Sequence, residues 1–98
     1  MLRIWAKLWK RGRIAESITV EDEHSDLPLR DRIGLLVEEI IHKLDLARPI
    51  FLPSNEKELK TYGATRFTQD HFIEDFPYQS LEIEIIEMDE DEDKKRKA

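Results

Sequence analysis

The clearest pattern of hydrophobic and polar positions lies in residues 28–44, PLRDRIGLLVEEIIHKL. Its apolar residues recur every three or four positions, the spacing that places side chains on one stripe of an α-helix. The stripe consists of Leu29, Ile33, Leu36, Val37, Ile40 and Leu44. Pro28 suits a first turn and Ser25 or Asp26 can cap it, so we expect the helix to start near residues 26 to 28. A single helix is marginal in water, so its stripe must pack on another element.

Three other stretches alternate with a period of two, which predicts β-strands. They span residues 2–9, 14–20 and 81–88, and Gly12 lies between the first two, where a tight hairpin turn favours glycine. The inward residues are expected to be Leu2, Ile4, Ala6 and Leu8, then Ile14, Ile18 and Val20, and finally Leu81, Ile83 and Ile85.

The segments between these elements are less regular. Residues 49–53 have a proline at each end, which predicts a short or edge strand. Ser54 or Asn55 can cap a second short helix, which buries Leu59 and Tyr62 and ends at Gly63. Residues 65–76, TRFTQDHFIEDF, fit neither period, since the first four residues favour an extended chain and the phenylalanines favour a helical turn.

These elements predict an α+β fold for residues 1–88. We expect a small, mostly antiparallel sheet of about four strands with one main helix, about residues 28–45, packed on one face, in the order β-β-α-β-α-β. Residues 89–98, DEDEDKKRKA, contain no apolar residue except the last alanine. Such a segment cannot bury enough surface to offset chain entropy, so we expect a charged, disordered tail.

Composition narrows the functional classes. The chain has 98 residues, of which 39% are charged, and no cysteine, which excludes disulfides and thiolate metal sites. Its apolar runs are far shorter than the ~20 residues that span a bilayer, and Arg3 and Lys7 interrupt the N-terminal stretch where a signal peptide needs continuous apolar residues. We therefore expect a cytoplasmic protein without membrane contacts. The net charge of −6 disfavours non-specific binding to nucleic acid.

The first candidate surface is the polar side of the first strand, Arg3, Trp5, Lys7 and Trp9. Basic residues that alternate with aromatic ones occur in proteins that bind single-stranded nucleic acid, where charges follow the phosphates and rings stack on bases. The structural alternative is that this strand lies beside the last one. Arg3 and Lys7 would then face Glu82 and Glu84, and the tryptophans would pack under the 65–80 segment. We favour this alternative, and a protein-contact surface is the third possibility.

The second candidate surface lies in the irregular segment and consists of Asp70, His71, Glu74 and Asp75, near Arg66. A histidine with nearby carboxylates can bind a divalent cation or a small molecule. A metal site needs three or four converging ligands, however, which an irregular backbone does not guarantee. The simpler interpretation is a salt-bridged turn, and a contact surface for a partner is the other alternative.

The sequence indicates no catalytic residue, metal ligand or cofactor. It has three glycines and no glycine-rich phosphate loop, and no serine has the surroundings of a nucleophile. An enzyme is therefore not the favoured class.

Three segments carry a resemblance to a known group of proteins. They are TRFTQDHFIE (65–74), RPIFL (48–52) and LEIEIIE (81–87), and RIWAK (3–7) precedes them. Over nearly the whole domain the chain resembles a family of small, functionally uncharacterised bacterial proteins of about 90 to 100 residues, chiefly from anaerobic Gram-positive bacteria. The resemblance implies no activity, cofactor or partner. It does group Arg66, Gln69, Asp70 and Glu74 as one polar set, which with His71 forms the candidate contact surface.

The sequence thus predicts a non-enzymatic binding or accessory protein that acts through protein contacts, with residues 65–76 as the contact surface. A homodimer through a sheet edge or an apolar face is a further expectation. The alternatives are small-molecule or metal binding around Arg66, Asp70, His71 and Glu74 and, more weakly, nucleic-acid binding through Arg3, Trp5, Lys7 and Trp9.

Overall fold

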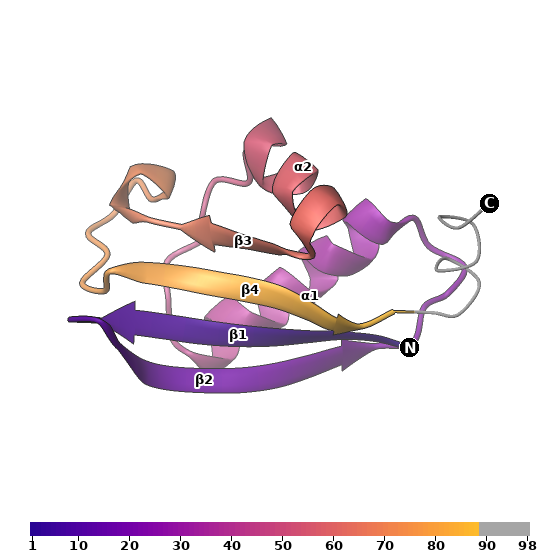
Figure 1. Cartoon of the computed structure of the whole chain (residues 1–98), viewed down its shortest axis with the longest axis horizontal. Helices are drawn as coiled ribbons and strands as arrows, with labels where there is room; N and C mark the ends of the chain where they lie inside the picture. The colour runs from indigo at the N-terminus through magenta and orange to yellow at the C-terminus, as the bar shows by residue number, and fades with distance from the viewer. Residues whose placement is uncertain (89–98) are drawn as a thin grey trace.

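A computed structural model describes residues 1–88 as one antiparallel sheet with two helices. The strands are β1 (Leu2–Lys10), β2 (Arg13–Asp22), β3 (Ala64–Phe67) and β4 (Ser80–Glu87). Their order in the sheet is β2-β1-β4-β3, so the first and last strands lie together at its centre (Figure 1). The α+β class and the four antiparallel strands are as predicted. The tail expected at residues 89–98 lies outside the described residues.

The longer helix, α1 (Leu29–Lys43), crosses behind the sheet in Figure 1 and covers one of its faces. Its predicted stripe shares one core with the alternate apolar residues of β1 and β4. The core consists of Leu2, Ile4, Ala6, Leu8, Val20, Leu81 and Ile83 from the sheet and Ile33, Leu36, Val37, Ile40, Ile41 and Leu44 from the helix region, together with Leu59, Phe67, Phe72 and Phe76. The expected cap is wrong, because no side chain bonds the first turn, which begins after Pro28.

The hairpin between β1 and β2 turns through Arg11 and Gly12, both with positive φ. This pair of left-handed residues matches the twist of antiparallel strands, as the glycine predicted. The β1–β2 register then shifts between Leu8 and Trp9. Leu8 lies opposite Glu16 and Trp9 opposite Ile14, so the bulge moves Ile14 off the core side and leaves it 43% exposed. The predicted inward position of Ile14 is therefore wrong.

The predicted strand at residues 49–53 is not formed, which changes the element order to β-β-α-α-β-β. Prolines at both ends remove two of the donors that a sheet ladder needs. A backbone hydrogen bond holds the segment from Ile50 N–H to His71 O, at 2.6 Å. The third strand is β3 instead, which pairs with β4 from Ala64–Glu84 to Phe67–Leu81. The irregular segment thus begins as a strand and continues as a 3-10 turn, Gln69–His71.

The second helix, α2 (Pro53–Tyr62), lies beside β3 at the edge of the sheet (Figure 1). It ends at Gly63, whose φ is +74°, as its position predicted. Leu59 is buried, but Tyr62 is 78% exposed, contrary to the prediction. Within residues 1–88, neither helix has the length and apolar character needed to cross a membrane.

Candidate functional site

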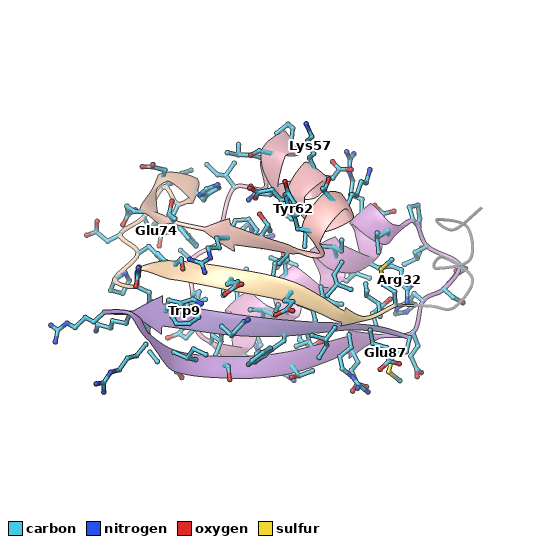
Figure 2. The ribbon with its side chains drawn as sticks, in the orientation of Figure 1. Trp9, Arg32, Lys57, Tyr62, Glu74 and Glu87 are labelled. Atoms are coloured by element: carbon cyan, nitrogen blue, oxygen red, sulfur yellow. The ribbon has the colours of Figure 1, made fainter. Side chains whose placement is uncertain are left out.

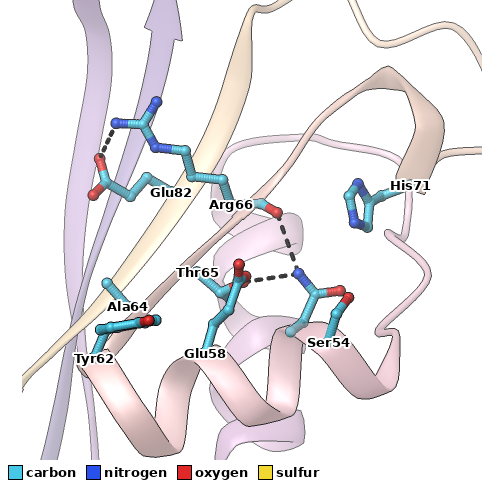
Figure 3. Close-up of a pocket in the computed structure, with 9 residues that line it drawn as sticks. Ser54, Glu58, Tyr62, Ala64, Thr65, Arg66, His71 and Glu82 are labelled. Atoms are coloured by element: carbon cyan, nitrogen blue, oxygen red, sulfur yellow. Dashed lines mark hydrogen bonds and ion pairs between the residues drawn. The ribbon is translucent and has the colours of Figure 1, made fainter.

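A polar pocket of about 350 Å³ lies between α2 and β3 (Figure 3). The helix contributes Ser54, Asn55, Glu58 and Tyr62, the strand Ala64, Thr65 and Arg66, and the pocket is completed by His71 and Glu82. The pocket therefore contains one guanidinium, one imidazole and two carboxylates. Groups of both charges fit a small molecule that itself carries both charges.

Asn55 organises this pocket from the buried side. Its Nδ2 donates to Thr65 Oγ1 at 2.8 Å and to the carbonyl of Arg66 at 3.2 Å, and its Oδ1 accepts from Leu52 N–H at 2.9 Å. The Thr65 hydroxyl donates to Glu58 Oε1 at 2.5 Å. The amide thus joins the first turn of α2 to the outer edge of β3 and satisfies polar groups that burial would otherwise leave unpaired.

The structure brings only part of the predicted polar set together. Arg66 and His71 line the pocket, with the His71 Nδ1 accepting from Thr68 N–H at 3.1 Å. Gln69 instead stabilises the turn, donating to Glu74 O and accepting from Phe76 N–H at 2.7 Å. Asp70 and the Glu74 side chain are exposed and do not line the pocket. Across residues 1–88, no three histidine or carboxylate side chains converge as metal ligands.

The other predicted surface, Arg3, Trp5, Lys7 and Trp9, lies on the sheet face opposite α1, which we call the open face. Trp9 lies on the near side of the sheet in Figure 2. Its indole N–H donates to Glu82 Oε1 at 2.8 Å, and the same oxygen lies 3.6 Å from Lys7 Nζ and 3.7 Å from Arg66. Glu82 therefore links the open face to the pocket.

Opposite charges pair across the open face, as the structural alternative predicted for Lys7. Its ammonium lies 3.0 Å from Glu84 Oε1 and 4.0 Å from the centre of the Trp5 ring, and its side chain is almost fully buried. Arg3 pairs instead with Glu21 and Glu87, because the two antiparallel ladders of β1 place it directly opposite these two residues. Carboxylates thus neutralise the basic residues, which argues against a phosphate-binding stripe.

An apolar groove of about 500 Å³ lies between α1 and the 48–53 segment. Its lining is Arg30, Ile33, Gly34, Val37, Glu38, Arg48, Pro49, Phe51, Leu52, Pro53 and Glu56. Ion pairs flank the apolar centre, Arg30 with Glu56 at 2.7 Å and Arg48 with Glu38. Sequence reasoning missed this groove, although three consecutive apolar residues between prolines were a signal for it.

A buried ion pair joins α1 to β2 and was also missed. The Arg32 side chain is fully buried near the end of the sheet (Figure 2), and its Nε donates to Asp22 Oδ2 at 2.8 Å. His24 Nδ1 lies 2.5 Å from the other carboxylate oxygen. Burial acts to raise the pKa of Asp22, but the hydrogen bonds from His24 and Arg32 outweigh it and hold the pKa at about 2. The hydrogen bond to Asp22 raises the pKa of His24.

The chain was also compared with known proteins. No protein-family model, curated protein or solved structure matches it. The resemblance to small bacterial proteins therefore stays a prediction.

Proposed function

We propose that this chain is a non-enzymatic binding protein that acts through protein contacts, with the apolar groove as its main contact surface. The observation that carries the proposal is the exposure of three consecutive apolar side chains beside the groove. Ile50 is 44%, Phe51 38% and Leu52 41% exposed. Contiguous apolar surface with a polar rim is typical of protein-interaction sites.

The groove lining indicates the chemistry of the partner. Ile33, Val37 and Phe51 provide apolar contacts, while the two flanking ion pairs each present one positive and one negative group. A protein segment with apolar side chains at its centre and charged side chains on both flanks fits this arrangement. Such a segment gains free energy from buried apolar area and direction from the charges.

The groove also adjoins the contact surface expected from the sequence. Ile50 N–H donates to His71 O at 2.6 Å, and the Phe51 and Phe67 rings lie 5.8 Å apart. Ile73, two residues after His71, is 91% exposed. We propose that residues 65–76 extend the groove surface, so that Arg66, Gln69, Asp70, His71 and Glu74 contribute its polar margin.

Filling the groove tests this function without removing any native contact. Gly34 lines the groove, and a Cβ placed on it meets no atom within 4 Å, so Gly34→Leu directs an apolar side chain into open space there. The probe is a set of peptides selected from a displayed library for binding to the native protein. We expect Gly34→Leu to weaken their binding by about tenfold or more.

The matched control is His42→Leu, which adds the same side chain at an exposed position of α1 outside the groove. It should leave binding unchanged. A selection that yields no binding peptide, or peptides that bind Gly34→Leu and the native protein equally, would contradict the proposal. Because leucine favours a helix more than glycine does, we expect Gly34→Leu to stay folded. A urea unfolding midpoint no lower than that of the native protein shows that lost binding does not stem from unfolding.

A second candidate function is binding of a small zwitterion, such as a free amino acid, in the pocket between α2 and β3. The observation that favours it is the convergence of Arg66, His71 and Glu58 in one pocket. The test is NMR titration of the protein with glycine, aspartate and lysine. Chemical-shift changes confined to this pocket would support zwitterion binding if Arg66→Met abolishes them and Arg48→Met, in the apolar groove, does not. Spectra without such changes would exclude binding of these three amino acids.

A further inference from the structure

The two outer strands of the sheet are protected to different degrees. At the β3 edge, α2 lies alongside and Asn55 Nδ2 donates to the carbonyl of Arg66. At the other edge, β2 pairs with β1 only. Outside that ladder, no hydrogen bond joins the backbone of residues 13–21 to any other described residue. The β2 edge therefore presents unpaired backbone groups to solvent.

The length and composition of β2 make this edge suitable for pairing. It has ten residues, whereas strands of about five or six are usual. Edge strands are commonly protected by lysine or proline, and β2 contains neither. Between Ile14 and Val20, Glu16 is the single charged residue. The bulge beside Ile14 is a protective feature, but it lies at one end and leaves the centre of the edge regular.

Charge along this edge changes sign from one end to the other. The hairpin end carries Lys10, Arg11 and Arg13, and the opposite end carries Glu21, Asp22 and Glu23. Asp22 is engaged by Arg32 and His24, and Glu21 by Arg3. Arg11, Arg13 and Glu23 form no ion pair with another residue of the described range 1–88. Charges at both ends thus remain available to a partner.

We propose that two copies of this chain associate through β2 in antiparallel orientation and form one continuous eight-stranded sheet. Antiparallel pairing places the basic end of each strand beside the acidic end of the other, and the two-fold symmetry forms this contact twice. Parallel pairing would place like charges together. The charge gradient therefore selects both the partner, which is a second copy, and the orientation.

The symmetry axis of this dimer is perpendicular to the sheet. Both copies of α1 then lie on the same side, and both open faces form one surface on the other side. None of the residues that line the apolar groove belongs to β2. The dimer is therefore independent of the proposed partner-binding function, and either can fail without the other.

Analytical ultracentrifugation of the whole chain, at protein concentrations from about 1 µM to about 1 mM, measures the dissociation constant of the dimer. We expect a species of twice the 11.7 kDa chain mass whose dissociation constant rises with salt, because exposed charges are screened. Two charge variants then test orientation. Arg11→Asp with Arg13→Glu makes both ends of the edge acidic, and Glu21→Lys with Glu23→Lys makes both ends basic. Each variant alone should dimerise about tenfold or more weakly than the native chain.

Mixing the two variants provides the decisive measurement. The acidic-edged and basic-edged chains complement each other at both ends, so a one-to-one mixture should recover native affinity. This recovery also shows that both variants are folded. The control is Lys57→Glu with Lys60→Glu, which lowers the net charge by as much as the acidic-edged variant does, but on α2. It should leave the dimer unchanged.

Three results would overturn the proposal. They are a chain that stays monomeric throughout the concentration range, a dimer that neither charge variant weakens, and charge variants that do not recover on mixing. A dimer that is unaffected by the β2 variants but lost in Gly34→Leu would place the second copy in the apolar groove instead.

Discussion

Replacing Asp22 by asparagine tests the buried ion pair that joins β2 to α1. Arg32 Nε donates to the carboxylate at 2.8 Å, and Arg32 Nη2 donates to the backbone carbonyl of Asp22 at 3.1 Å. Asparagine keeps the size of the side chain and one acceptor oxygen, and the backbone contact is retained. The substitution therefore removes the negative charge while conserving most of the packing.

We expect Asp22→Asn to lower the free energy of unfolding by about 2–3 kcal/mol. Removing one partner of a buried ion pair costs ~3–5 kcal/mol, and the retained hydrogen bonds place this variant at the lower end, about 3 kcal/mol. The pKa of Asp22 gives a second value. Burial opposes ionisation, but the hydrogen bonds from His24 and Arg32 outweigh it and lower the pKa from 3.8 to about 2, which corresponds to roughly 2 kcal/mol. Either value is a large share of the ~5–15 kcal/mol that stabilises a typical domain.

Urea unfolding followed by tryptophan fluorescence measures this loss. The control is Glu56→Gln, which removes the carboxylate of a partly exposed pair, Arg30–Glu56, at 2.7 Å. We expect the control to lose less than about 1 kcal/mol at pH 7. Because the pKa of Asp22 is lowered, its contribution is complete above pH 3.8 and disappears as the pH falls through about 2. A loss for Asp22→Asn no larger than that of the control, or one unchanged by acid, would show that the Asp22 charge does not stabilise the fold.

Three further predictions concern His24, Asn55 and the two glycines Gly63 and Gly34. The hydrogen bond to Asp22 raises the pKa of His24, so protonated His24 stabilises the fold at pH values below 6.5. This contribution is lost as the pH rises through the raised pKa, and His24→Gln should therefore flatten the fall of the free energy of unfolding with pH, measured by urea titration. Asn55→Ala should cost ~1–3 kcal/mol in the same assay, because Thr65 and the Leu52 N–H lose a buried partner; an unchanged midpoint would contradict this. Gly63→Ala should lower the free energy of unfolding by about 1 kcal/mol because φ is positive there, whereas Gly34→Ala should raise it by ~0.5–1 kcal/mol, since α1 has room for the methyl group. If both alanine variants changed the free energy of unfolding in the same direction, this prediction would be wrong.

On the open face and in the pocket, the sequence predicted which residues share a face but not which of them come into contact. Alternation placed Arg3, Trp5, Lys7 and Trp9 on one face, but the role of Glu82 depends on which strands are neighbours. Likewise, Arg66 and His71 meet in one pocket because β3 and the 3-10 turn both lie beside α2. Asp70 and Glu74, only a few residues away, are directed elsewhere.

Local sequence determined the elements whose burial is one-sided. A stripe every three or four residues or an alternation of two reports which side faces a core, so α1, β1 and β4 were predictable without knowing their neighbours. The positive φ of Gly12 and Gly63 was also predictable, because few other residues adopt it without strain.

Tertiary structure alone decided the pairing and its consequences. The bulge that exposes Ile14, the choice of residues 64–67 rather than 49–53 as the third strand, and the burial of Arg32 against Asp22 all depend on contacts between residues distant in the chain. No local pattern encodes such contacts, since the free energy of a strand pair or a buried charge is set by its partner. The apolar groove and the open β2 edge arise in the same way, as the surfaces that the packing of all other elements leaves uncovered.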